Sequence, residues 1–511
     1  MNEDQQRLSE QLNILKEIGY SDLGKRYEDA GTYTTRAERD RDSHRDVRLL
    51  DTIALFLTTG KPGDVFAIAF DKPCPTQLVI AKNGPPAPDD IVAANDLLTL
   101  IADPTISDVH GFFPFLLKRC GANINKRITK LHKAIKDKEL LADFTLELGE
   151  YDPEPDIAVE FPQLLTPLYG ETVPAFASVW SDLIDRVTTL TANELNANDV
   201  TDSENMYDQI VFNANILVHS RFLAYVIDNA EIQRKWRVER LKRRLDKICQ
   251  YSTGAKRLVK KTTVLPPNPH WVMENFAGTG ESEFNLCESA YDAASHGLGG
   301  PLSAETESEL HQFFPDMIDH WKNRRIHARL HAELRIILYL GRPSEDEPPI
   351  HAIGLSKRSC LCCALWIKLH NLQFGTRWMT SGSHGKPYPN WALPGTACVY
   401  ARREDGGGSL VDDALLEGVS IRFNDALTKP GSPSQNTLSD DFISGESSDS
   451  GASLTESHKV SRTASVRSAP VTEVNGTTPF PKQPSKSPAT SQLSYAEVAR
   501  YDFLSLSIYI N

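Results

Sequence analysis

The stretch that decides the fold runs from His331 to Cys363. It reads HAELRIILYL from His331, and SCLCCALWIKL from Ser359. Each segment places polar or sulfur-bearing side chains directly before an apolar run. We therefore expect two buried helices, each carrying functional side chains in its first turn.

Three side chains in this stretch, His331, Cys360 and Cys363, are of the kinds that bind zinc. Zinc takes about four ligands in a tetrahedron, and a catalytic zinc leaves one position to water. Two cysteines three positions apart in a first helical turn face the same way, and the helix N-terminus favours their thiolate form. Glu333 follows the histidine by two residues, so it can move protons beside the metal without being a ligand.

The order of these residues resembles the zinc deaminase signature, H-x-E followed by P-C-x-x-C. Here His331-x-Glu333 is followed, 29 positions after the histidine, by Cys360-x-x-Cys363. The segment between them, 349–357, reads as a short strand that leads into the second helix, as in the cytidine-deaminase-like superfamily. Ser359 departs from the pattern, which has proline there, but serine is a good helix N-cap.

The form SKxSCxxC is most similar to the nucleic-acid deaminase-like proteins of fungi and some intracellular bacteria. The resemblance implies an α/β fold, namely an α/β/α sandwich around a mixed sheet. It also implies a Zn²⁺ ion held by His331, Cys360 and Cys363, with Glu333 as the catalytic proton carrier. The expected reaction is hydrolytic deamination of cytosine or adenine, in a nucleic acid or a nucleotide.

The residues also allow other interpretations of the site. A C-x-x-C pair occurs in structural zinc knuckles and redox pairs, so a structural zinc or thiol cluster is an alternative. His327 precedes His331 by one helical turn and would be the ligand in a shifted register. Cys362 and Cys398 are expected to be buried thiols rather than ligands.

Length and composition bound the rest of the chain. The 511 residues, 40% of them apolar, allow two to four domains. The sequence contains no window of ~20 apolar residues, so we expect no membrane span. The N-terminus is polar and lacks the apolar core of a signal peptide. Eight scattered cysteines indicate a reduced, intracellular protein, cytoplasmic or nuclear and not secreted. The net charge of −13 argues against a wholly basic nucleic-acid coat but permits a local basic patch.

The pattern predicts five regions. Residues 1–44 form a polar helical arm. A helix and two strands occupy 45–87, as at the start of the deaminase fold, and should complete the sheet of the zinc-binding core at 326–405. A helical insertion over 88–325 separates the two, although 45–87 could instead be a separate module. The Ser/Thr/Pro-rich tail, 406–511, has one possible element at Ala414–Phe423 and is otherwise expected to be largely disordered and open to protein partners.

The resemblance also implies substrate-binding residues. Asn83 ends the second predicted strand, where deaminases often place an asparagine against the substrate sugar; the alternative is a turn residue. The loop after the strand at 377–380 is expected to contact the substrate through His384, Lys386, Tyr388 and Trp391. The alternative is an ordered Gly/Pro loop with a packed tryptophan.

A basic stretch within the insertion is a candidate phosphate-binding patch, and a solvated helix face or a nuclear-import signal explains it equally well. Its residues are Arg237, Arg240, Lys242, Arg243 and Arg244. The leading interpretation of the whole chain is a nucleic-acid deaminase. The alternatives are a deaminase of a free nucleoside, nucleotide or small aminated metabolite, and a non-catalytic interaction protein stabilised by zinc.

Overall fold

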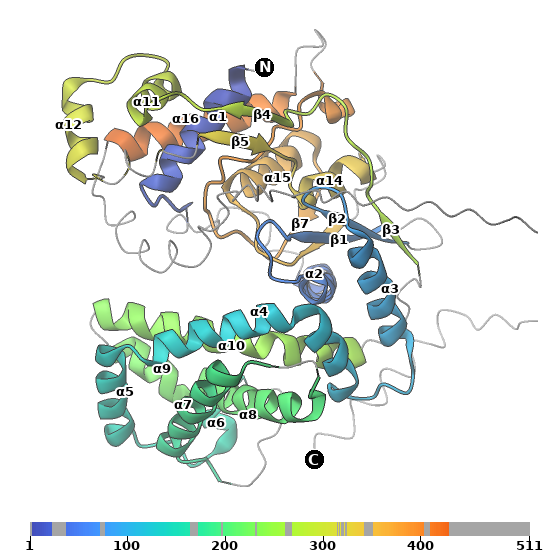
Figure 1. Ribbon diagram of the computed structural model, residues 1–511, viewed down its shortest axis with the longest axis vertical. Helices are drawn as coiled ribbons and strands as arrows, with labels where there is room; N and C mark the ends of the chain where they lie inside the picture. Colours follow the sequence, from blue (N-terminus) through green and yellow to red (C-terminus); the bar gives the residue numbers. More distant parts are fainter. Residues whose placement is uncertain are drawn as a thin grey trace, which may run out of the picture. The chain divides into compact units, whose positions relative to one another are not determined.

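In the computed structural model, the described residues all lie in one unit, within 1–451. The structure describes residues 3–22, 37–71, 77–163, 172–195, 198–229, 232–260, 268–313, 315, 317, 321, 324–341, 351–402 and 409–428 (Figure 1). The predicted disorder and partner binding of the tail beyond Thr428 therefore lie outside the described residues.

A five-stranded mixed sheet lies at the centre of the fold, with the order β3-β2-β1-β6-β7. The strands are β1 (Phe66–Asp71), β2 (Gln77–Lys82), β3 (Pro269–Trp271), β6 (His351–Leu355) and β7 (Trp378–Met379). β1 pairs antiparallel with both β2 and β6, whereas β3 and β7 lie parallel to their neighbours. The predicted α/β fold with a mixed sheet is confirmed.

The sheet joins two segments that are far apart in the sequence. Ala67 lies opposite Leu355, and the backbone N–H of Phe66 donates a hydrogen bond to Ser356 Oγ, 290 positions away, at 2.9 Å. The helix and hairpin within 45–87 therefore complete the same sheet as the strand between His331 and Cys360. The alternative of a separate N-terminal module is wrong.

Helices cover both faces of the sheet. α2 (Ala37–Leu57) packs on β6 and β1, and α14 (Ala332–Leu340) packs on β1, β2 and β6 from the other side. α15 (Leu361–Phe374) contacts α14. Strand residues alternate between two apolar cores, as the two-residue period of a strand requires. The α2 side receives Phe66, Ile68, Leu78 and Ile80, and the α14 side receives Ala67, Ala69, Val79, Ala81, Ile353 and Leu355.

The insertion is helical up to Lys260, as predicted. Its helices are α3 (Pro88–Ala102), α4 (Phe113–Ile135), α5 (Lys138–Glu150), α6 (Ile157–Glu160), α7 (Phe176–Asn193), α8 (Val200–His219), α9 (Arg221–Asn229) and α10 (Ile232–Lys260). α4 and α10 pack against α2, so the helical region shares the core on that side of the sheet.

The predicted extent of the helical insertion, to residue 325, is wrong. β3 follows α10 and adds an edge strand beside β2. β4 (Ser282–Asn285) and β5 (Arg325–Ala328) form a small antiparallel sheet, and α11 (Ala290–Leu298) and α12 (Ala304–Phe313) lie between them in the chain. The residues from β3 onward pack mainly in the same core as α14. Strands of three or four residues are too short to show a period in the sequence.

The two ends of the described chain also differ from the prediction. α1 (Glu3–Glu17) is no solvated arm, since Leu8, Leu12 and Leu15 are fully buried and it packs on α11 and α16 (Leu410–Thr428). α16 contains the possible element predicted at 414–423 and extends beyond it at both ends. Both helices bury polar groups through tertiary hydrogen bonds: Gln5 Nε2 donates to the carbonyl of Trp391 at 2.9 Å. Such pairing is invisible in a helical pattern.

In the described part of the chain, no individual helix has the length and apolarity needed to cross a membrane, whereas α8 and α9 meet that test together across a 55° bend.

The contact between α2 and β6 yields a stability prediction. A methyl group on Gly354 would collide with backbone atoms of Leu50 and Asp51, and the N–H of Leu355 donates to Asp51 Oδ1 at 2.6 Å. We expect Gly354→Ala to lower the free energy of unfolding by about 1–3 kcal/mol, because backbone must move to admit the methyl group. Urea titration followed by circular dichroism measures this.

Gly149→Ala is the matched control. Gly149 lies on α5, and no other atom lies within 4 Å of the added carbon. Alanine there should leave stability unchanged or raise it slightly. Equal stabilities of the two variants would contradict the close packing at Gly354.

Candidate active site

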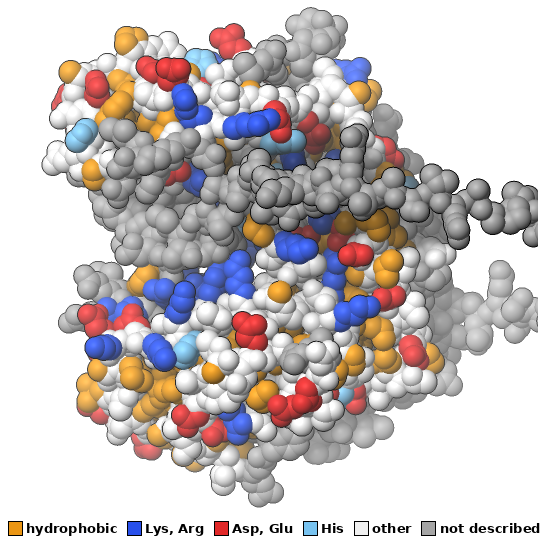
Figure 2. All heavy atoms as spheres, viewed as in Figure 1, with side chains coloured by type: hydrophobic (Ala, Val, Ile, Leu, Met, Phe, Trp, Pro, Cys, Tyr) orange, Lys and Arg blue, Asp and Glu red, His pale blue; other side chains and the backbone are white. Residues whose placement is uncertain are grey.

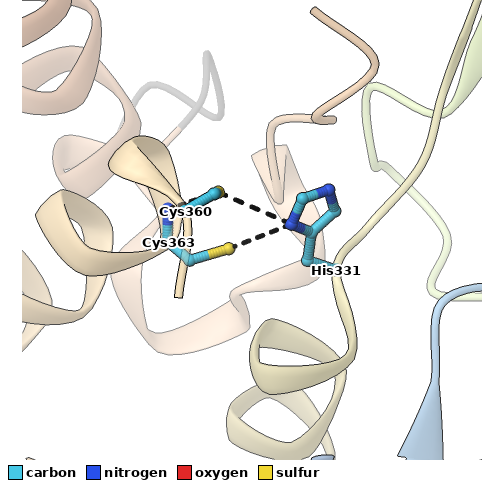
Figure 3. A group of neighbouring side chains, drawn as sticks. All are labelled: His331, Cys360 and Cys363. Atoms are coloured by element: carbon cyan, nitrogen blue, oxygen red, sulfur yellow. Dashed lines mark hydrogen bonds between the residues drawn. The ribbon is translucent and has the colours of Figure 1, made fainter. Parts of the chain in front are cut away.

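His331, Cys360 and Cys363 meet where two helices begin. His331 is the N-cap residue of α14, and Cys360 is the N-cap residue of α15. The Nδ1 atom of His331 lies 3.5 Å from Cys360 Sγ and 3.4 Å from Cys363 Sγ. Figure 3 shows the imidazole ring facing both thiols across the space between the two helices. The structure therefore brings together the three residues that the sequence singled out.

The spacing of these three donor atoms fits a tetrahedral zinc ion. A sulfur at about 2.3 Å and a nitrogen at about 2.05 Å from zinc, at the tetrahedral angle, lie about 3.6 Å apart. The observed separations of 3.4 and 3.5 Å match this value. The three atoms all lie within 4.8 Å of one another, so one ion can contact all of them and retain a fourth position.

The electrostatics of the group favour one charged thiolate. Burial opposes ionisation of Cys360, but hydrogen bonding from Cys363 and the adjacent His331 ring hold the pKa of Cys360 well below its usual range. Burial raises the pKa of Cys363. Burial also lowers the pKa of His331, but the neighbouring Cys360 thiolate outweighs that effect and leaves it raised.

Glu333 lies in the first turn of α14, close to the cysteines. Its side chain is 3% exposed, and burial raises the pKa of its carboxyl group. The nearby Cys363 thiol lowers this pKa and so partly offsets the effect of burial. A buried carboxyl beside these donor atoms is suited to take up and release a proton.

Asn83 stands at the start of α14, just after β2. Its Oδ1 accepts the backbone N–H of Ala332, the residue after His331, at 2.7 Å. Its backbone N–H donates to the carbonyl of Val65 at 3.1 Å, which fixes the turn. Asn83 therefore lies at the candidate site, as predicted, and it also anchors the N-terminus of α14.

The loop after β7 is tied to the N-terminus of α15. The backbone N–H of His384 donates to the carbonyl of Ser359 at 3.1 Å, and the N–H of Leu361 donates to the carbonyl of Lys386 at 2.9 Å. The Tyr388 ring lies between two histidines, 6.1 Å from the His331 ring and 5.7 Å from the His384 ring. The structure thus brings the predicted loop to the site.

The prediction that Trp391 contacts substrate is wrong. Trp391 is fully buried, so no substrate can stack on its ring. Its indole Nε1–H instead donates a hydrogen bond to Cys363 Sγ at 3.1 Å. Trp391 therefore supports a candidate metal ligand, a role for which a lone tryptophan in a loop gives no sequence signal.

The alternative ligand His327 is excluded by its position. It lies on β5, not one helical turn before His331, and its Nδ1 lies 2.9 Å from Glu283. Cys362 and Cys398 are fully buried, as expected. Within the described residues, neither belongs to a group that could hold a metal ion.

The basic stretch lies on α10, which packs against α2, α4, α5, α8 and α9. Arg237 is already engaged by carboxylates of α5, namely Glu139 and, at 3.6 Å, Asp143. Arg240 lies over the ring of Trp236 at 5.6 Å. Figure 2 shows Lys and Arg side chains gathered on this face of the helical region. The candidate patch is therefore partly neutralised from within the fold, and Lys242, Arg243 and Arg244 make up the rest of it.

Comparison with known proteins finds one family. A family model described as an OTT_1508_deam-like deaminase matches residues 330–395. No curated protein and no solved structure matches the chain. The matched segment holds His331, Glu333, both cysteines and the loop up to Trp391, so the similarity to a deaminase covers the candidate site.

The hydrogen bond from Trp391 predicts a measurable effect on metal binding. Outer hydrogen bonds to metal ligands typically contribute about 10- to 100-fold in affinity. We expect Trp391→Phe to weaken zinc binding by at least about tenfold, measured by competition with a chromophoric chelator. In the cobalt-substituted protein, the sulfur-to-cobalt charge-transfer band should also shift.

Trp366→Phe is the matched control. Trp366 is equally buried, and its indole N–H donates to Asp412 Oδ1 at 2.9 Å instead of to a cysteine. This variant should keep zinc affinity and the cobalt band even if it lowers stability. Equal zinc affinities in the two variants would contradict the role assigned to Trp391.

Proposed function

We propose that this protein is a zinc-dependent hydrolytic deaminase acting on cytosine or adenine in a nucleotide or nucleic acid. The observation that carries the proposal is the spacing of His331 Nδ1 from two cysteine sulfurs, 3.5 and 3.4 Å, within a segment that matches a deaminase family. The buried carboxyl group of Glu333 beside them supports it.

His331, Cys360 and Cys363 would hold the zinc ion. When bound there, zinc would supply Lewis acidity that brings the pKa of a water molecule toward neutrality. Glu333 accepts the proton released when the water oxygen bonds to the carbon that bears the amino group. Glu333 passes this proton to the ring nitrogen. It then takes the second proton, from the hydroxyl group that the water has become, and passes it to the leaving amine. The C–N bond breaks, the water oxygen becomes the carbonyl oxygen of the product, and ammonia leaves.

The surrounding residues would hold the base in place. Asn83 anchors α14, and its side-chain amide nitrogen has no hydrogen-bond partner among the described residues, so it can donate to the substrate sugar. Tyr388 lies within ring-contact distance of His331 and is suited to packing against a base. His384 and Lys386 belong to the same loop and are the proposed donors. The basic residues of α10 support a phosphate-bearing substrate.

Glu333→Gln tests the chemistry. General acid–base catalysis contributes about 10²- to 10⁴-fold, so we expect kcat to fall by at least about 100-fold while one equivalent of zinc is retained. Ammonia release is measured on a panel of nucleosides, nucleotides and short single-stranded RNA and DNA. Glu417→Gln, an exposed glutamate on α16, is the control and should match the wild type. Wild-type turnover that persists in Glu333→Gln would refute the role of Glu333.

Removal of the metal separates catalysis from structural support. We expect a chelator to abolish turnover and added zinc to restore it, while the far-ultraviolet circular dichroism spectrum changes little, because two apolar cores hold the fold. If chelation unfolds the protein, and the zinc-loaded protein turns over no substrate, the zinc is structural.

A further inference from the structure

In the extended segment that leads into His331, side chains alternate between a buried face and an exposed face. Ile326, Ala328 and Leu330 are buried, whereas Arg325, His327 and Arg329 are exposed. This follows from the two-residue period of an extended chain. The exposed side of β5 therefore carries basic side chains toward the candidate metal site, and Arg329 is the last of them.

Basic side chains on either side of Arg329 are paired with carboxylates. Glu283 binds both Arg325, at 2.6 Å, and His327, at 2.9 Å. On the other side of the Asn83 turn, Lys82 lies 3.0 Å from Asp64 and 2.8 Å from Asp90. Within the described ranges, the guanidinium of Arg329 has no carboxylate and no hydrogen-bond partner. Arg329 is thus a charge without a partner, two residues from His331.

The backbone of Arg329 is held rigidly. Its N–H donates to the carbonyl of Asn390 at 2.9 Å, and its carbonyl accepts the N–H of Ala392 at 3.0 Å. These bonds fix Arg329 to the end of the loop that carries His384, Lys386 and Tyr388. The loop that borders the candidate metal site therefore also fixes the backbone position from which the Arg329 side chain extends.

The side chain of Arg329 reaches the turn that follows β2. Its Nη1 atom lies 3.8 Å from the point where a side chain on Gly84 would begin, and nothing else lies within 4 Å of that point. Gly84 has a φ of +83°, and it follows Asn83, whose Oδ1 holds the N-terminus of α14. An open space with a free guanidinium on one side therefore adjoins the residue proposed to contact the substrate sugar.

We propose that Arg329 binds a phosphate group of the substrate, so that the enzyme acts on a phosphorylated nucleotide unit in preference to a free nucleoside. This inference rests on the proposed function. A guanidinium matches two phosphate oxygens with two parallel N–H donors, and such charge-assisted pairs are about twice as strong as neutral ones. A base at His331 and a sugar at Asn83 place the sugar's phosphate beside Gly84.

The test compares one base in three forms: the nucleoside, its 5′-monophosphate and a short single-stranded oligonucleotide. Arg329→Gln should lower kcat/KM for a phosphorylated form by about 10- to 100-fold, mainly through KM, and leave the nucleoside unchanged. Arg329→Lys keeps the positive charge but lacks the two parallel N–H donors, so it should recover part of the loss. A loss with the monophosphate identifies a mononucleotide phosphate, and a loss confined to the oligonucleotide identifies a backbone phosphate.

Arg325→Gln is the control, because Arg325 lies on the same edge but is paired with Glu283. It should alter none of the three rates. If Arg329→Gln lowers kcat/KM equally for the nucleoside and the phosphorylated forms, or does not lower it at all, the inference about Arg329 is overturned. Turnover by the wild type would still support the proposed function in that case. No wild-type turnover on any form would overturn both.

Discussion

The structure depends on two helices that begin side by side at one edge of a sheet. The strand register explains why they do: Lys82 at the end of β2 lies opposite Phe66 at the start of β1, and Ala67 lies opposite Leu355 at the end of β6. Asn83 and Ser356 therefore leave the sheet at the same edge. Asn83 holds the first turn of α14, and the chain after Ser356 enters α15 five residues later. The His331 ring meets the cysteine sulfurs because of this register.

Several contacts stabilise the position where His331 lies next to Cys360 and Cys363. Gly354 lets α2 lie directly on β6, and the loop after β7 is bonded to Ser359 and Leu361 at the start of α15. Trp391 extends the support to Cys363 itself. Of the basic side chains around the site, Arg325 is paired with Glu283, and Lys82 with Asp64 and Asp90. The guanidinium of Arg329 is left available beside the Asn83 turn.

The sequence predicted the features that depend on local pattern. The residue types and spacing of His331, Cys360 and Cys363 identified the candidate metal group, and the apolar runs around Ile68 and Ile80 predicted the hairpin that completes the sheet. What the sequence did not reveal depends on tertiary partners. The burial of α1 and α16 follows from contacts between helices about 400 residues apart, such as the bond from Gln11 Nε2 to Ser420 Oγ. The hydrogen bond from Trp391 to Cys363 likewise joins side chains from separate parts of the chain, and neither residue type predicts it.

X-ray absorption at the zinc edge of the zinc-loaded protein tests the proposed metal site most directly. We expect one zinc ion with two sulfur ligands at about 2.3 Å and lighter ligands at about 2.0–2.1 Å, one of them a histidine nitrogen. A coordination shell with three or four sulfurs, or one that is unchanged in a Cys360→Ser variant, would contradict it.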